Sequence, residues 1–228
     1  MERKFILTDK FVINSFGIKL FQIKCTKSFK YAQKGDFGGY VEKEGNLDQE
    51  NDAWVFGNAR VFGNARVSSN ARVSGDARVS SNAWVSGDAW VSGDAWVSGD
   101  ARVFGNARVS GNAWVSGNAW VSGDAWVSSN AWVSGDAWVS GNAWVSGNAD
   151  IENDNEHCGF DGFGSCNHHT HAYMTKEKKV EIICGCFRGS IEEFEKKVEE
   201  THSGTVYEKQ YKSIINVIKI KFGLTDFT

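Results

Sequence analysis

The residues with the most evident chemical potential are histidines and cysteines gathered toward the C-terminus. Thiol and imidazole groups are ligands that Zn²⁺ prefers. Their spacing matches no standard zinc ribbon or finger, since Cys184 and Cys186 are separated by one residue instead of two. A zinc site therefore stays an alternative to buried thiols with solvent-facing histidines, and we predict no metal ion, no cofactor and no catalytic residue. The cluster comprises His157, Cys158, Cys166, His168, His169, His171, Cys184 and Cys186.

A second group of residues is suited to binding, because tryptophans and arginines recur in the middle of the chain at multiples of six. The sequence contains 10 Trp. Indoles stack on one another and guanidinium groups lie over indoles, each contact contributing about 0.5–1.5 kcal/mol. Such contacts could simply stiffen the fold, or they could form an apolar surface that binds a partner. The predicted interaction surface comprises Trp90, Trp96, Trp114, Trp120, Trp126, Trp132, Trp138, Trp144, Arg72, Arg102 and Arg108.

These residues belong to a repeat that runs from Ala53 to Ile151 with a period of six, A-[WR]-V-[SF]-[GS]-[DN]. The period and the β-branched valines argue against a helix. In a strand Ala and Val face one side while Trp or Arg and Ser face the other, and the following Gly or Ser with Asp or Asn forms a corner. A strand that turns after every hexad must wrap around an axis, so the repeat predicts a solenoid with valines inside.

The hexad Val85–Trp90, Val-Ser-Gly-Asp-Ala-Trp, resembles the repeat of hexapeptide proteins, which form a left-handed parallel β-helix. That resemblance implies three hexads per 18-residue coil, between five and six coils, and left-handed winding, whereas the physical default for parallel crossovers is right-handed. Sorting by 18 residues then places all ten tryptophans outside, in three rows. The predicted fold is mainly β, a left-handed hexapeptide β-helix with a small β cap before it and a small α+β domain after it.

The flanks divide the chain into three predicted domains, a β cap and entry coil (1–52), the β-helix (53–151) and an α+β domain (152–228). An open solenoid end exposes unpaired strand edges and must be covered. KFILT and GIKLFQIKC are predicted strands of the first cap, around a turn at residues 14–17. After the repeat we expect an acidic, polar linker.

The C-terminal domain is predicted to be a β-hairpin with two helices. Strand character is found at 171–174 and 179–184. Ser190 to Glu193 reads as a capping box that opens the first helix. The second helix is expected at about 207–222, with apolar residues at helical spacing.

Charge and cysteine usage exclude several classes of protein. The net charge is −3 and the pI about 6.0, so the chain is not a polycationic nucleic-acid binder. Residues 1–43 are rich in Lys, which leaves direct nucleic-acid contact uncertain. The cysteines are odd in number, 5, and no secretory signal precedes them, which favours free thiols in a reducing cytoplasm. No apolar stretch is long enough for a membrane span.

Lys34–Val41, the GNARV-type repeats, Cys184–Phe194 and Lys197–His202 resemble hexapeptide proteins encoded in phages and prophages. This resemblance implies a small accessory protein that acts by binding, including inhibition of host defences such as CRISPR nucleases; the HHTH run at 168–171 departs from it. Hexapeptide acyltransferases need a histidine base and an excursion from the coil, and the related carbonic anhydrases need three zinc-binding histidines. The coils contain no histidine.

We therefore expect a non-enzymatic binding protein of phage origin that inhibits or docks on a host protein or ribonucleoprotein complex in the bacterial cytoplasm, without membrane attachment. One alternative is a structural homo-oligomer assembled through the Trp-rich faces. A second is a diverged hexapeptide acyltransferase.

Overall fold

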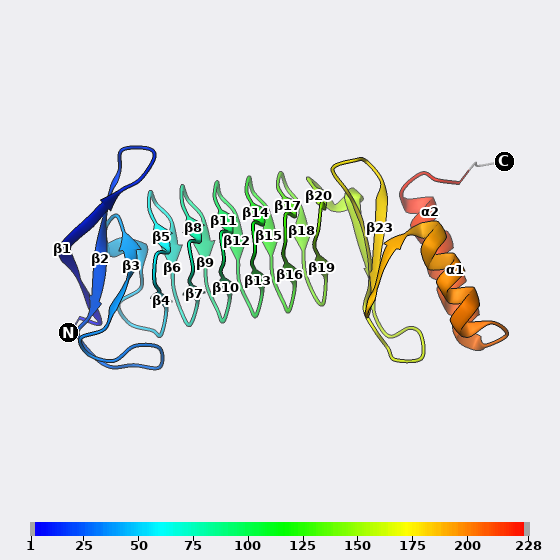
Figure 1. Ribbon diagram of the computed structural model, residues 1–228, viewed down its shortest axis with the longest axis horizontal. Helices are drawn as coiled ribbons and strands as arrows, with labels where there is room; N and C mark the ends of the chain where they lie inside the picture. The colour runs from blue at the N-terminus through cyan, green and yellow to red at the C-terminus, as the bar shows by residue number, and fades with distance from the viewer. Residues whose placement is uncertain (1–2, 226–228) are drawn as a thin grey trace.

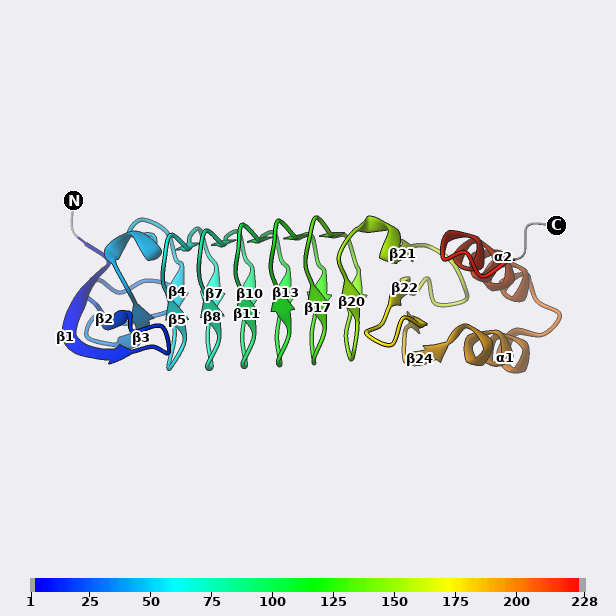
Figure 2. The same ribbon diagram turned by 90° about the horizontal axis from the view of Figure 1, so that it is seen from above.

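The computed structural model describes residues 3–225, so residues 1–2 and 226–228, the outer ends of the first and last predicted domains, lie outside the described residues. A regular stack of coils lies between a β cap at one end and an α+β unit at the other (Figure 1). The view from above shows the same order along the long axis, with the two termini at opposite ends (Figure 2).

The coils are built from two-residue strands that recur every six residues and pair in parallel with the strand 18 residues later, which makes three sheets along the stack. The predicted solenoid is therefore confirmed. The first sheet contains β4 (Trp54–Val55), β7 (Arg72–Val73), β10 (Trp90–Val91), β13 (Arg108–Val109), β16 (Trp126–Val127) and β19 (Trp144–Val145). The second contains β5 (Arg60–Val61), β8 (Arg78–Val79), β11 (Trp96–Val97), β14 (Trp114–Val115), β17 (Trp132–Val133) and β20 (Asp150–Ile151). The third contains β6 (Arg66–Val67), β9 (Trp84–Val85), β12 (Arg102–Val103), β15 (Trp120–Val121) and β18 (Trp138–Val139).

The core of the stack consists of alanine and valine. Val97 and its counterparts one coil away are 0% exposed, as are nearly all the alanines that precede the outward residue. Burial of each valine contributes about 1.5–3 kcal/mol, which the stack repeats in every hexad. Corners are formed by residues with positive φ, such as Gly87 (φ 68°), where an added Cβ would lie 2.8 Å from the backbone nitrogen of Gly105. Glycine therefore permits the coils to stack closely at the corners.

The N-terminal cap is an antiparallel hairpin, β1 (Phe5–Ile13) and β2 (Lys19–Cys25), joined to β3 (Phe37–Val41). The two strands and the turn predicted there are confirmed. β3 pairs in parallel with β5, so the chain enters the solenoid at Val41. The side chain of Asn46, in a short 3₁₀ helix at Glu44–Asn46, donates hydrogen bonds to the carbonyls of Gly63 and Ala65.

The C-terminal unit differs from the prediction of a linker and a single hairpin. A 3₁₀ helix at Asp154–Glu156 leads directly into a four-stranded antiparallel sheet. Its strands are β21 (His157–Phe160), β22 (Thr170–Met174), β23 (Val180–Cys184) and β24 (Phe187–Ser190), and two helices follow, α1 (Ile191–His202) and α2 (Val206–Lys221). β21 and β24 were missed because His-Cys-Gly-Phe and Phe-Arg-Gly-Ser are not enriched in β-branched residues. The capping box at Ser190 and both helices are confirmed.

The sheet lies between the last coil and the helices, and its two faces have different partners. Tyr173 and Ile183 belong to the core of the solenoid, whereas Ala172 and Ile182 pack with Phe194 of α1 and the buried residues of α2. The last coil therefore has no open apolar end. In residues 3–225 no helix is long and apolar enough to cross a membrane.

Side chains from this unit also satisfy the exposed strand edge of the last coil. The Asp154 carboxylate accepts a hydrogen bond from the backbone N–H of Trp138 at 2.7 Å. The Nδ1 atom of His171 donates to the carbonyl of Trp144 at 3.0 Å. Unpaired edge groups invite association with other strands, and these two bonds satisfy one donor and one acceptor at the end of the stack.

Candidate interaction surface

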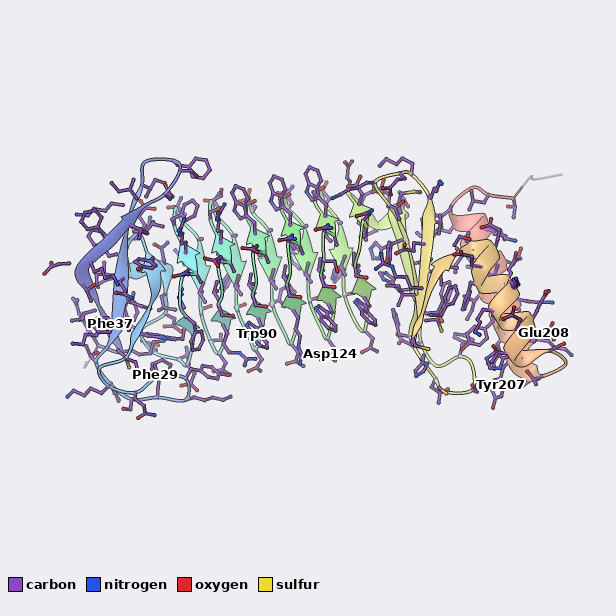
Figure 3. The ribbon with its side chains drawn as sticks, viewed as in Figure 1. Phe29, Phe37, Trp90, Asp124, Tyr207 and Glu208 are labelled. Carbon is purple, nitrogen blue, oxygen red and sulfur yellow. The ribbon has the colours of Figure 1, made fainter. Side chains whose placement is uncertain are left out.

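Three rows of outward side chains follow the three sheets, and we name each row after its first strand. The 18-residue register makes every member a neighbour of the one in the next coil, for example Trp96 beside Trp114. The β4 row contains Trp54, Arg72, Trp90, Arg108, Trp126 and Trp144; the β5 row contains Arg60, Arg78, Trp96, Trp114, Trp132 and Asp150; the β6 row contains Arg66, Trp84, Arg102, Trp120 and Trp138. Figure 3 shows Trp90 projecting outward from the coils.

The expectation that all ten tryptophans lie outside is wrong for Trp54. Its side chain is at its predicted place in the β4 row, yet it is only 1% exposed. The rings of Phe5 and Phe29 cover it, with centroids 6.4 and 5.4 Å away. The cap folds back over this end of the row, and Tyr31 also lies over the guanidinium of Arg72.

The tryptophans farther along the rows are stacked and still open to solvent. In the β5 row the ring centroids of Trp114 and Trp132 are 4.9 Å apart with an interplanar angle of 1°, and Trp96 lies 5.2 Å from Trp114 at 5°. Trp126 and Trp144 stack similarly in the β4 row. Trp96 is half-buried. The exposed ones are Trp84, Trp90, Trp114, Trp120, Trp126, Trp132, Trp138 and Trp144, with 36–53% of the residue accessible.

Serines in the neighbouring coil hold the indoles in place. The indole N–H of Trp84 donates to the hydroxyl of Ser68 at 2.8 Å, and the same offset of 16 residues recurs for Trp90, Trp96, Trp114, Trp126 and Trp132. A satisfied indole N–H presents an apolar ring whose rotamer is already fixed. Sequence reasoning missed this bond, although the Ser–Trp offset was visible in the repeat.

The β6 row is interrupted where phenylalanine replaces the serine. Phe104 stands 16 residues before Trp120 and meets its ring edge-on, with centroids 5.8 Å apart. Trp120 and Trp138 are accordingly tilted by 66° instead of stacked. A shallow cavity of about 320 Å³ opens here, lined by Trp84, Ser86, Arg102, Phe104 and Trp120.

The arginines carry the positive charge of the coils, and three of them lie against aromatic rings. Arg72 lies over Trp90 at 4.8 Å, Arg102 over Trp120 at 5.1 Å and Arg78 over Trp96 at 5.9 Å. In residues 3–225 the arginines that form salt bridges are Arg3 and Arg188, outside the coils. Beyond Arg108 the remaining coils contain neither Arg nor Lys. The rows therefore run from a cationic end near the cap to an apolar end.

Asparagine and aspartate alternate along one corner from Asp52 to Asn142 and along a second from Asn82 to Asp136, and an asparagine amide donates a hydrogen bond to the aspartate carboxylate of the next coil. Asn82 donates to Asp100 and Asn106 donates to Asp124, each at 2.9 Å. At these two corners the pairing replaces the repulsion that stacked carboxylates would have. Asp124 marks one such corner in Figure 3.

The histidines and cysteines of the C-terminal unit separate onto the two faces of its sheet. His157 and His171 face the last coil, where His157 Nδ1 lies 3.2 Å from His171 Nε2, and His169 Nδ1 lies 2.8 Å from Asp161. Cys184 faces the helices and accepts a hydrogen bond from Thr170. Within residues 3–225 no three His, Cys, Asp or Glu side chains are arranged to hold a metal ion. All five cysteines are free thiols, and Cys166, Cys186 and His168 are exposed.

Burial changes the proton affinities of this cluster. The expectation of solvent-facing histidines is wrong for His171, which is 1% exposed, and burial lowers its pKa to about 3. Burial also lowers the pKa of His157. The thiol of Cys158 has a pKa raised to about 11 by burial, so it is a weak nucleophile. These values fit a structural role better than acid–base chemistry at neutral pH.

Comparison with known families supports the repeat architecture. A family model described as the YdcK beta solenoid repeat matches residues 71–87 and 101–117. Each stretch spans three consecutive strands, which is almost one coil. The chain is thus similar to that solenoid repeat over these two segments. No sequence among the curated proteins matches it.

Proposed function

We propose that the chain is a non-enzymatic binding protein whose outward Trp and Arg rows dock on a host protein or ribonucleoprotein complex. The observation that carries this proposal is the exposure of eight tryptophans in ordered rows. Tryptophan and arginine dominate the energetics of protein interfaces, and side chains already fixed in one rotamer lose little entropy on binding. A globular protein gains no stability from leaving so many indoles partly in water.

The rigidity of the scaffold supports a binding role. Seven of the eight exposed indoles are held by stacking, by a serine hydroxyl or by a guanidinium, Trp138 meets Trp120 edge-on, and the coils beneath are fully packed. A partner would therefore meet a preformed surface with little need for rearrangement. The cavity at Trp84, Arg102 and Trp120 is the concave part of this surface and suits a single side chain of the partner.

We further propose that the chain is a phage or prophage accessory protein with a left-handed hexapeptide β-helix, and that it acts against host defence in the bacterial cytoplasm. The support for this proposal is the resemblance of Lys34–Val41, Cys184–Phe194 and Lys197–His202 to such proteins. A CRISPR nuclease complex is one target of this kind. Direct contact with nucleic acid would add to the docking through the lysine-rich residues 1–43.

Capture from a bacterial lysate tests the proposal. The intact chain is immobilised and compared with a variant carrying Trp90→Ser, Trp120→Ser and Trp126→Ser. Phe163→Ser is the matched control, because Phe163 is similarly exposed (37%) but lies in the C-terminal unit. We expect a defined set of proteins to be retained by wild type and control and lost with the triple variant. Undiminished capture by the triple variant contradicts the proposal.

The anti-defence role needs its own experiment. Cells with an active CRISPR system receive a targeted plasmid, with and without expression of the chain. We expect transformation to rise at least about tenfold with the wild type and not with the triple variant, since loss of an interface centre weakens binding strongly. A nuclease-treated parallel of the capture experiment reports whether nucleic acid is part of the captured complex. Equal transformation with and without the chain contradicts anti-CRISPR action.

A further inference from the structure

We propose that a second copy of this chain binds face to face on the β5 row, in an antiparallel arrangement with a two-fold axis at Trp96. Two-fold dimers bury the same patch on both copies, so the patch must be complementary to its own reversal. The inference does not rest on the proposed function, because the β4 and β6 rows remain free for another partner.

The order of residues in the β5 row has this self-complementarity. With Tyr40 of β3 in register with Arg60, the row reads from the cap onward Tyr40, Arg60, Arg78, Trp96, Trp114, Trp132, Asp150, so reversal about Trp96 places Tyr40 on Asp150 of the other copy. Reversal places Arg60 on Trp132 and Arg78 on Trp114 of the other copy, while Trp96 meets its own equivalent. Every guanidinium then lies opposite an indole and no two guanidinium groups face each other, so the reversed rows meet without a like-charge contact.

The surrounding strands obey the same symmetry. In the sheet order β3-β5-β8-β11-β14-β17-β20 the strand of Trp96 is β11, the central one. A two-fold axis there matches β3 with β20, so the whole parallel part of this sheet overlaps with its copy. Neither end of this parallel part is left without a counterpart, while β1 and β2 continue the sheet beyond it.

The other two rows do not have this property. Reversal of the β6 row places Arg102 on the Arg102 of the second copy, which is repulsive in an interface. The cap covers the start of the β4 row, where Trp54 is buried and Tyr31 lies over Arg72. The β5 row is therefore the one that can pair flat along its length.

The ends of the sheet supply additional area and charge. The parallel strands form a face of about 29 by 13 Å, on the order of 400 Å². This is about half of the area that each partner buries in a stable interface. Beyond β3, the hairpin exposes Ile13 (64%) and Phe16 (63%), and Phe16 packs on Phe62 beside the row. In the antiparallel arrangement the hairpin, which carries Lys10, Lys19 and Lys24, approaches residues 150–161 of the other copy, which contain five acidic residues. Lys178 of the same copy pairs with Asp150, so the attraction of the hairpin lysines comes from the other four carboxylates of this segment.

A swap of one predicted contact tests the orientation. Sedimentation velocity of the intact wild type is expected to show a dimer. Trp114→Arg places an arginine against Arg78 of the other copy, twice per dimer, and should weaken association at least about tenfold. Adding Arg78→Trp restores an Arg–Trp contact at both places, and the double variant should return to within about threefold of wild type.

The chain itself provides a control for folding and specificity. Arg108 lies between Trp90 and Trp126 in the β4 row, so the coils accept an arginine between two tryptophans. Trp126→Arg makes a comparable change in exposure and charge outside the predicted interface and should leave the dimer unchanged. Circular dichroism verifies that each variant keeps the fold.

Four results overturn the proposal. They are a monomeric wild type at about 100 μM, dissociation unaffected by Trp114→Arg, no rescue by the double variant, and equal weakening by Trp126→Arg. A monomer leaves the β5 row to a different partner. Dissociation by salt is also expected, because charge at the two ends contributes to the orientation.

Discussion

Acidification should destabilise the junction between the last coil and the C-terminal sheet, and His171 is the group responsible. In the folded chain this imidazole is neutral, because burial lowers its pKa from 6.5 to about 3. In the unfolded chain it takes up a proton below pH 6.5. The unfolded state therefore binds more protons between these two values, and stability falls as the pH falls through this window.

The size of the effect follows from the two pKa values. The contribution of His171 to the free energy of unfolding is fully present above pH 6.5 and decreases by about 1.4 kcal/mol per pH unit below it. Between about pH 7.5 and pH 4.5 the loss is about 2.7 kcal/mol. Burial also lowers the pKa of His157, which lies 3.2 Å from His171, and this adds to the loss in the same direction.

Denaturation of the intact chain at a series of pH values measures this loss, with His171→Gln as the matched variant. A glutamine amide can still donate to the carbonyl of Trp144 but does not titrate. We expect the variant to be less stable than wild type near pH 7.5 and to show a pH dependence smaller by about 1.4 kcal/mol per unit. Equal pH dependence of the two proteins would refute the assignment of His171 as a buried neutral imidazole.

Three other changes have definite expected outcomes. Trp54→Ala should lower the free energy of unfolding, measured with heat or denaturant, by about 3–5 kcal/mol, because the side chain is 1% exposed under Phe5 and Phe29. Trp84→Ala, at 46% exposure, should lower it much less. Equal losses would contradict the covered end of the β4 row. Gly87→Val should destabilise the stack by about 1–3 kcal/mol, because φ is 68° and a Cβ would meet the Gly105 backbone. The unfolding midpoint measures this loss, and an unchanged midpoint would contradict the corner geometry. Phe104→Ser should supply a hydrogen-bond acceptor for the Trp120 indole N–H and bring Trp120 into parallel stacking with Trp138. The stacking should appear as a stronger near-ultraviolet circular dichroism signal. An unchanged spectrum would contradict the role of Phe104 in tilting the two rings.

The solenoid could be predicted from sequence because each coil depends on residues at a fixed spacing. Valine at every sixth place and a small residue at each corner determine the inward side, and the 18-residue register then assigns every outward residue to its row. These are local constraints repeated many times. The composition of all three rows follows from them.

The parts that escaped prediction depend on contacts between distant segments. Trp54 is buried by Phe5 and Phe29, which no periodicity relates to it. His171 is buried because one face of β22 meets the carbonyl of Trp144, and the strand pattern does not reveal which face would do so. Chemically similar residues such as His171 and Cys184 were grouped by sequence proximity, while the sheet separates them onto opposite faces.

Covalent labelling of tryptophan followed by peptide mass spectrometry tests most directly whether valines fill the coils and indoles line the outside. Each tryptophan reports its own exposure in the intact folded chain. Trp84, Trp90, Trp126, Trp138 and Trp144, which lie outside the proposed dimer face, should be modified readily, and Trp54 should be protected until the protein unfolds. Protection of those five to the same degree as Trp54 would contradict the account.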